Sequence, residues 1–176
     1  MPDAPIATAP APSLIRNGGI EADAWQVFQP TENSALPADE AGWIVPLPAW
    51  LSSPAALRAR RHPVGVLLPS DTELKDWAGE AGKPGKIDFT GIAFIAVDFP
   101  VYTDGRGYTL AQQLRRQYGY AGELRAVGDV LIDTIHYQAR VGFDSFLVKP
   151  GHDPAKALAA LHTFSVHYQK AYRVPA

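Results

Sequence analysis

A short apolar run, Ile92-Ala93-Phe94-Ile95-Ala96-Val97, constrains the fold of this chain more than any other stretch of its sequence. The run is rich in β-branched and aromatic residues and shows no alternation of apolar with polar positions. That pattern predicts a strand buried on both faces, as in a parallel sheet. The strand is expected to end at Asp98-Phe99-Pro100, because proline cannot continue the hydrogen-bonded ladder.

The same pattern, a short apolar run followed by a helical stretch, recurs along the chain and predicts an α/β fold of about five βα units. The predicted strands are 43–47, 64–68, 92–97, 124–127 and 145–148, and the predicted helices are 53–61, 70–81, 109–118, 129–142 and 153 to at least 168. Such alternation implies a mainly parallel sheet with right-handed crossovers. A full (β/α) barrel needs about 250 residues. We therefore favour an open or incomplete barrel-like sheet, which a second copy in a homodimer could complete, over an open doubly wound sheet.

The first part of the chain has a different texture. Residues 1–12 are rich in alanine and proline, which predicts a disordered tail. A short hairpin is expected next, in which the strand Leu14-Ile15-Arg16 turns at Asn17-Gly18 and returns through Trp25–Phe28. The predicted organisation is a tail at 1–12 and a single α/β domain at 13–176, with the hairpin at 13–29 and the βα repeats at 43–172.

Composition removes several classes of function. The net charge of −2 and the pI near 6.2 give no electrostatic case for binding nucleic acid or an anionic membrane. No apolar run approaches the roughly 18 residues of a membrane-spanning helix, and the amino terminus lacks the pattern of a signal peptide. We therefore expect a cytoplasmic protein. The sequence has no cysteine, so disulfide exchange, a cysteine nucleophile and a cysteine-ligated cluster are excluded, and we expect no bound cofactor.

A candidate site follows from the predicted topology. In both architectures ligands bind beyond the carboxyl ends of the strands, and the loops there are called the rim below. Arg106 is the strongest candidate, because it lies between two glycines that allow close backbone approach, just before a helix expected to start at Thr109. Alternatively, Arg106 pairs with Asp98 or Asp129 and pins the loop. The rim is expected to collect Asp98, Asp104, Arg106, Tyr108, Asp129, Lys149 and His152.

The chemistry expected of this rim is weak binding of a small oxyanion such as sulfate or sulfite, because three aspartates would oppose strong anion binding. Those aspartates could instead hold Mg²⁺. A helix cap would also explain Asp129, and a turn would explain Asp104, so we do not expect a metal site. Arg125 faces either the sheet packing or the rim. The expected ligand-binding residues are Asp98, Thr103, Asp104, Gly105, Arg106, Gly107, Tyr108, Arg125, Gly128 and Asp129.

Four stretches together resemble a known family. They are Asp98-Phe99-Pro100, Thr103-Asp104-Gly105-Arg106-Gly107-Tyr108, Gly122-Glu123-Leu124-Arg125-Ala126-Val127-Gly128-Asp129-Val130-Leu131 and Gly142-Phe143-Asp144. The combination resembles the bacterial domain-of-unknown-function family nine-three-four, often labelled a probable oxidoreductase of sulfite reduction. The resemblance covers roughly residues 43–161 and brings no catalytic residues with it. The chain differs from the usual family pattern at Val101, Tyr102 and Thr134.

The resemblance implies a functional context, because members of that family typically accompany sirohaem sulfite reductase and sulfate assimilation. We expect an auxiliary protein of assimilatory sulfate or sulfite reduction, which works with sirohaem sulfite reductase by contact or by binding a small anionic ligand. The alternative is a stand-alone enzyme on a small barrel-like fold, with a carboxylate and arginine site at the carboxyl ends of the strands. A purely structural role is a third hypothesis.

Overall fold

The structure, a computed structural model, describes residues 13–31, 36–79 and 85–163. The tail predicted at 1–12 and the end of the last predicted helix lie outside these residues. The described elements are β1 (Ser13–Arg16), β2 (Gly19–Ala22), β3 (Gln26–Val27), β4 (Trp43–Pro46), α1 (Leu47–Ser52), α2 (Pro54–Arg58), β5 (Val64–Leu68), α3 (Leu74–Trp77), β6 (Ile92–Phe99), α4 (Arg106–Arg116), β7 (Glu123–Gly128), α5 (Ile132–Val141), β8 (Ser145–Val148) and α6 (Pro154–Leu161).

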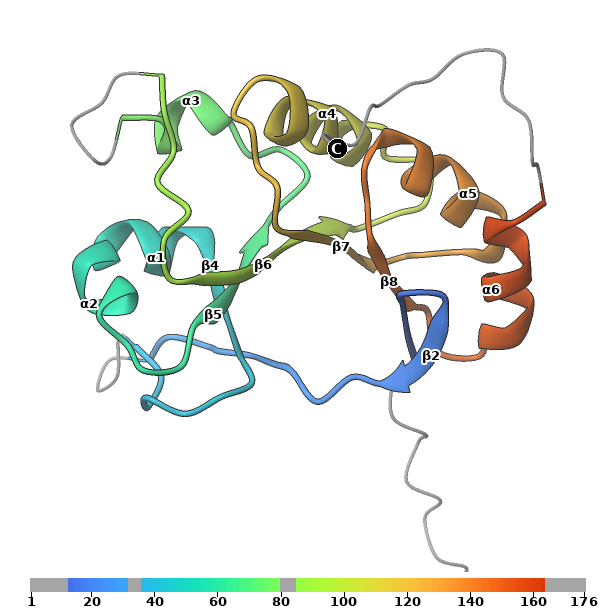
Figure 1. Cartoon of the computed structure of the whole chain (residues 1–176), viewed down its shortest axis with the longest axis horizontal. Helices are drawn as coiled ribbons and strands as arrows, with labels where there is room; N and C mark the ends of the chain where they lie inside the picture. Colours follow the sequence, from blue (N-terminus) through green and yellow to red (C-terminus); the bar gives the residue numbers. More distant parts are fainter. Residues whose placement is uncertain (1–12, 32–35, 80–84, 164–176) are drawn as a thin grey trace, which may run out of the picture.

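The strands form one sheet in the order β2-β1-β8-β7-β6-β5-β4-β3. From β3 to β8 the strands follow the chain and pair in parallel, whereas β1 pairs antiparallel with both β2 and β8. Sequential order with crossovers of one hand puts all helices on the same face of the sheet. Figure 1 shows the helices arranged around the outside of the strands. This is the winding of a barrel, and the doubly wound alternative is excluded.

The sheet is strongly curled, as the short connection between its two edge strands demands. β2 ends at Ala22 and β3 begins at Gln26, so only four residue steps, about 14 Å at full stretch, separate opposite edges. In a flat sheet, the seven gaps between eight strands would place those edges about 34 Å apart. The sheet therefore forms an open half-barrel, and the connection runs across its inner face.

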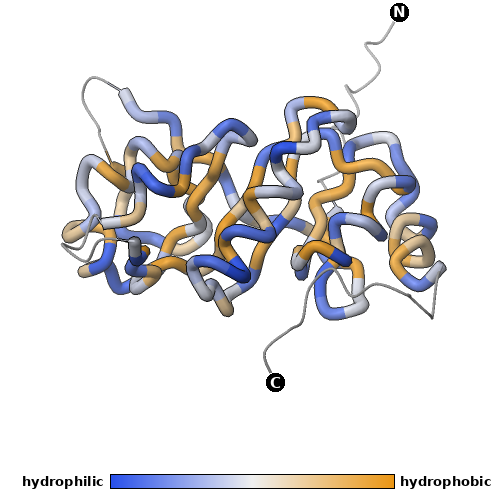
Figure 2. Tube along the Cα trace, turned by 90° about the horizontal axis from the view of Figure 1, so that it is seen from above, coloured by the Kyte–Doolittle hydropathy of each residue, from blue (hydrophilic) through white to orange (hydrophobic). Residues whose placement is uncertain are grey.

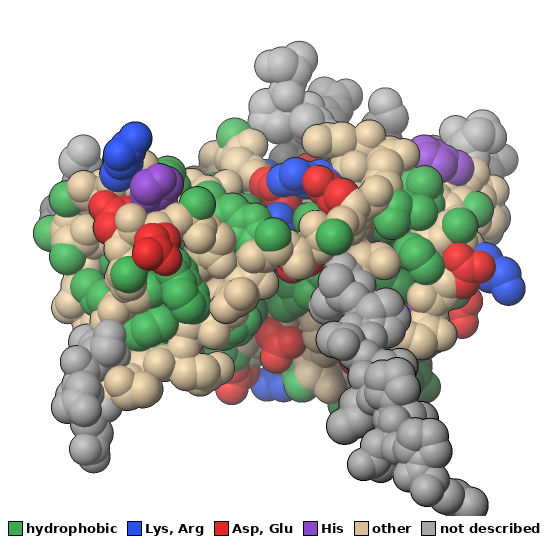
Figure 3. Space-filling view, turned by 90° about the horizontal axis from the view of Figure 1, so that it is seen from below, with side chains coloured by type: hydrophobic (Ala, Val, Ile, Leu, Met, Phe, Trp, Pro, Cys, Tyr) green, Lys and Arg blue, Asp and Glu red, His purple; other side chains and the backbone are tan. Residues whose placement is uncertain are grey.

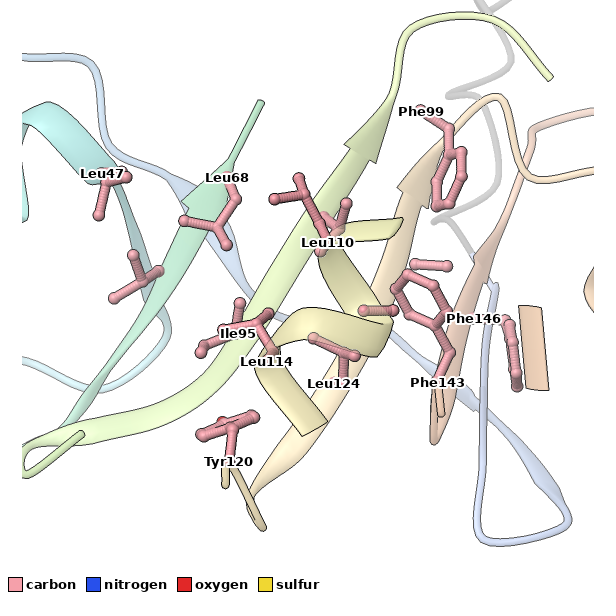
Figure 4. Packing of buried hydrophobic residues seen from close by; sticks show 14 of the residues in the cluster. Leu47, Leu68, Ile95, Phe99, Leu110, Leu114, Tyr120, Leu124, Phe143 and Phe146 are labelled. Atoms are coloured by element: carbon pink, nitrogen blue, oxygen red, sulfur yellow. The ribbon is translucent and has the colours of Figure 1, made fainter. Parts of the chain in front are cut away.

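Two apolar cores result from this shape. The outer core lies between the sheet and the helices, where Leu110 and Leu114 of α4 pack over the strands that carry Ile95 and Leu124 (Figure 4). Ile95, Leu114 and Leu124 are fully buried, and the burial of each side chain contributes about 1.5–3 kcal/mol.

The inner core is small. It consists of Ile44, Phe94 and Ala96, with Trp25, Leu67 and Val127 packed against them. The ring of Trp25 meets Phe94 edge-on, with 4.7 Å between centroids. The connection between β2 and β3 thus supplies an aromatic side chain to the inner core. In Figure 2 the hydrophilic residues mostly follow the outer turns of the trace, and hydrophobic stretches run through its middle.

The five strands predicted within the βα repeats are confirmed. The mainly parallel, barrel-like sheet is confirmed as well. It has three further strands: β1 and β2, which are attached through antiparallel pairing, and the parallel strand β3. The hairpin is present, and its turn has positive φ at both Asn17 (52°) and Gly18 (72°), as this tight connection requires. Its second strand was wrongly predicted, since β2 follows the turn directly. The predicted return strand, Trp25–Phe28, instead contains β3 at the opposite edge.

The helices differ more from the predictions. The helix predicted at 70–81 shortens to α3, and Ser70 does not cap it. The helix predicted from Thr109 begins three residues earlier, at Arg106. α5 ends as predicted at Gly142, whose φ of 116° suits glycine. α6 begins where the last helix was predicted, and the Asp153 carboxylate caps its first turn. No helix in the described ranges has both the length and the hydrophobicity needed to cross a membrane.

Candidate functional site

Asp104 organises the connection between β6 and α4. Its carboxylate accepts hydrogen bonds from the Ser70 hydroxyl (2.7 Å), from Nε and Nη2 of Arg106 (3.0 and 2.7 Å) and from the backbone N–H of Arg106 (3.0 Å). The side chain of Asp104 is only 8% exposed, whereas that of Arg106 is 60% exposed. Arg106, then Ser70, hold the pKa of Asp104 well below its usual range. Arg106 is therefore ion-paired, and its partner is Asp104 rather than Asp98 or Asp129.

The two glycines beside Arg106 have different roles. A Cβ at Gly107 would lie 2.6 Å from the ring of Phe99, so this glycine lets α4 approach β6 closely. A Cβ at Gly105 would meet nothing within 4 Å. Tyr108 packs edge-on against Phe99, and partial burial raises the pKa of its hydroxyl. Gly107 and Tyr108 are thus explained by packing, while Thr103 lies exposed in the preceding turn.

A hollow of about 280 Å³ opens beside Arg106. One wall is the connection between β5 and α3, and the other is the first two turns of α4. The hollow places Arg106, from the predicted loop, and Thr109, the predicted start of the following helix, opposite residues 70–73, which were assigned to another helix. Its lining residues are Ser70, Asp71, Thr72, Glu73, Arg106, Thr109, Leu110 and Gln113.

A second cluster lies on the rim around Asp129. The Asp129 carboxylate accepts a hydrogen bond from Nζ of Lys149 (2.6 Å) and one from the backbone N–H of Tyr102 (2.9 Å). These contacts lower the pKa of Asp129, with a smaller contribution from the charge of His152. The prediction that Asp129 caps the following helix is wrong, because α5 begins at Ile132. Asp129 instead ties together the loops that follow β6, β7 and β8.

Asp98 occupies a separate position at the end of β6. It shares the inner face with Phe94 and Ala96, because side chains two residues apart in a strand point the same way. Burial raises the pKa of Asp98. Its Oδ1 lies so close to the backbone of Gly128 that a Cβ there would be 2.4 Å away, and Gly128 also has a φ of 88°. Within the described residues, the Asp98 side chain makes no hydrogen bond.

Arg125 does not reach the rim. It lies in the middle of β7, fully buried, with its guanidinium 3.7 Å from the centre of the Phe94 ring. Its nitrogens bond Oε1 of Glu123 (2.8 Å) and Oδ1 of Asp23 (3.2 Å), and Asp23 belongs to the connection between β2 and β3. Of the two orientations that the sequence left open, the structure shows the one within the sheet packing.

Glu123 completes this buried cluster on the inner face. It accepts a hydrogen bond from the Ser145 hydroxyl (2.7 Å) and another from Arg16 (3.3 Å). Burial alone would raise its pKa, but the bonds from Ser145 and Arg125 and the charges of Arg125 and Arg16 outweigh burial and lower it. The cluster is an ion-pair network that fastens the connection to the sheet.

The three aspartates considered for Mg²⁺ are engaged separately. Asp104 pairs with Arg106, Asp129 pairs with Lys149, and Asp98 forms no ion pair with any residue of the described ranges. Among the described residues, no group of three or more histidine, cysteine, aspartate or glutamate side chains is arranged to hold a metal ion. On the face seen in Figure 3, acidic and basic side chains are interspersed with apolar ones and form no extended patch of one sign.

Sequence reasoning missed the wall of the hollow formed by residues 70–73, and also Gln113. Ser70 and Glu73 have the spacing of a helix-capping pair, which drew them into the predicted helix. The signal that could have found them was their position directly after β5. The rule that loops at the carboxyl ends of strands converge was applied only to the three later strands.

Comparison with known proteins gave one match, to a family model that spans more than half of the chain. A family model described as bacterial protein of unknown function (DUF934) matches residues 65–176. The chain belongs to this family. The match begins within β5 and includes β6 to β8, the hollow and the Asp129 cluster, while β1 to β4 precede it. No curated protein and no solved structure gave a match.

Proposed function

We propose that this chain is an auxiliary protein of assimilatory sulfate and sulfite reduction that works by direct contact with sirohaem sulfite reductase. The proposal has two grounds. One is the label of probable oxidoreductase of sulfite reduction, which is often attached to the family that this chain resembles. The other is an observation, the exposed apolar pair Val101-Tyr102 on the rim. These side chains are 51% and 53% exposed. The proposal includes a cytoplasmic location and no cofactor of its own.

The loop that carries this pair is held in a fixed shape. The backbone N–H of Tyr102 donates to Asp129, which is held in turn by Lys149. The backbone N–H of Asp104 donates to the carbonyl of Val101 (2.9 Å). A loop fixed before binding loses little conformational entropy on association, and aromatic side chains are enriched in protein interfaces. The pair is therefore suited to anchoring a protein partner.

Contact is favoured over capture of a small oxyanion by the surroundings of Arg106. Its guanidinium is already neutralised by Asp104, and the adjoining hollow also contains Asp71 and Glu73. Sulfate or sulfite would meet one paired cation and three carboxylates. Like charges at close range oppose such binding.

The test is complementation of a deletion strain of the bacterium that encodes this chain. The strain should grow poorly on sulfate or sulfite and normally on cysteine, and the native gene should restore growth. A Val101→Ser/Tyr102→Ser double variant should fail to restore it. The matched control is Tyr137→Ser, which removes a 55% exposed tyrosine from α5 and should restore growth. Normal growth of the deletion strain on all three sulfur sources would overturn the proposal.

The alternative, a stand-alone enzyme, draws support from Asp98. A half-buried carboxylate with a raised pKa, at the carboxyl end of a central parallel strand, is suited to proton transfer. If this alternative holds, Asp98→Asn abolishes complementation while the Val101→Ser/Tyr102→Ser variant retains it. The opposite pattern supports the contact function, so the two variants separate the two hypotheses.

A further inference from the structure

The hollow beside α4 has one positive and one negative wall. Arg106, Thr109 and Gln113 are spaced three and four residues apart on one face of α4. Asp71 and Glu73 lie on the opposite wall, in the connection between β5 and α3. Arg106 has its pKa raised chiefly by Asp104, and Asp71 adds a smaller contribution, which places Asp71 within electrostatic reach of the guanidinium.

Several polar groups of the hollow have bonding capacity to spare. Arg106 uses Nε and Nη2 on Asp104, and its Nη1 makes no hydrogen bond with any described residue. The same holds, within the described ranges, for the hydroxyl of Thr109, the amide of Gln113 and the carboxylate of Asp71. In the part of the chain that the structure describes, Glu73 has a single loose and highly exposed pairing, with Lys75 at 3.6 Å. The hollow thus offers donors on one side and acceptors on the other.

The size and charge of the hollow select a class of ligand. Its volume of about 280 Å³ is just below the range of about 300–1,000 Å³ for small-molecule pockets, and is too small for a nucleotide or a macrocyclic cofactor. A dianion would be opposed by the acidic wall, and a simple cation would leave Nη1 of Arg106 and the Thr109 hydroxyl without an acceptor. A small molecule with a carboxylate and an ammonium group matches both walls, and Leu110 offers an apolar contact for a short side chain.

The geometry points to a binding site for a small free α-amino acid. The carboxylate of the ligand lies toward Nη1 of Arg106 and the Thr109 hydroxyl, and its ammonium group lies toward Asp71 and Glu73. Gln113 can donate to the carboxylate through its amide. The inference is independent of contact with the reductase, since it uses the hollow and not Val101-Tyr102.

The test titrates the ¹⁵N-labelled full chain by NMR with L-alanine and L-serine, and with two analogues of alanine. Propionate lacks the ammonium group and ethylamine lacks the carboxylate. We expect saturable shifts at residues around the hollow for the amino acids, and binding at least about tenfold weaker for each analogue, because each loses charge-assisted hydrogen bonds. Thr109→Val and Asp71→Asn should each weaken amino-acid binding. Asp76→Asn, which alters an exposed carboxylate of α3 outside the hollow, should leave it unchanged.

Several outcomes would overturn the inference. Propionate binding as tightly as alanine would make the hollow an anion site, and ethylamine binding as tightly as alanine would make it a cation site. Absence of shifts up to about 10 mM amino acid, well above the millimolar dissociation constants of weak metabolite sites, would remove the site altogether. Because no reductase is present in the titration, none of these results depends on the function proposed above.

Discussion

Replacing Arg125 by methionine should destabilise the protein severely. Methionine is apolar and of similar length, so it could fill the buried position, but it cannot pair with the neighbouring carboxylates. The Arg125 guanidinium is fully buried, pairs with Glu123 and Asp23, and stacks on Phe94. Removing one partner of a buried ion pair costs about 3–5 kcal/mol, because the remaining charge stays buried without its partner. Arg16 still bonds Glu123 after the substitution, so we expect the lower end of that range, about 3 kcal/mol.

Urea denaturation measures this effect directly. With a slope of about 2 kcal/mol per molar urea, a loss of about 3 kcal/mol lowers the unfolding midpoint by about 1.5 M. The matched control is Arg116→Ala, an exposed arginine of α4, which should change the unfolding free energy by less than about 0.5 kcal/mol. A loss below about 1 kcal/mol for Arg125→Met would show that Arg125 does not act as the partner of buried charges, because removing one member of a buried ion pair costs more than that.

Three further predictions concern the rim and pH. Gly128→Ala should lower the free energy of unfolding in urea by about 1–3 kcal/mol, because Gly128 has a positive φ and an added Cβ would lie against Oδ1 of Asp98. Gly105→Ala should leave the free energy of unfolding unchanged, because an added Cβ there meets no atom within 4 Å. Asp98→Asn should raise the urea midpoint at pH 7, because the folded state disfavours the charged form, and the gain should vanish below about pH 3.9, where the unfolded aspartate is also protonated. The lowered pKa values of Asp104, Glu123 and Asp129 favour the folded state at neutral pH, so thermal stability should fall as the pH drops below about 4.

The sequence predicts the central part of this fold well because its strands are short, mainly apolar runs. β4 to β8 each combine such a run with a following helix, and that local pattern survives folding. β3 has only two residues, both exposed, and exists because its chain reaches the edge of β4. No local signal marks such a strand. Its position depends on how far the whole sheet curls.

The site was less predictable, because it depends on which charges meet. Arg106 pairs with an aspartate two residues away, a contact that loop geometry decides. Arg115 has the periodicity of a mostly outward residue on α4, yet it is only 8% exposed and donates to the backbone carbonyls of Tyr120 and Gly122. The alternation of side chains along β7 places Arg125 on the inner face of the sheet. Its partner Asp23 is brought there by the path of the connection between β2 and β3. Long arginine side chains reach partners that periodicity alone does not reveal.

Direct contact with the reductase can be measured by calorimetric titration of the purified chain into purified sirohaem sulfite reductase. We expect saturable binding. The Val101→Ser/Tyr102→Ser variant should bind about thirtyfold more weakly, which corresponds to the loss of a hot-spot contact of about 2 kcal/mol, while Tyr137→Ser should bind as the native chain does. No detectable binding, or equal affinity of the double variant and the native chain, would exclude the proposed contact.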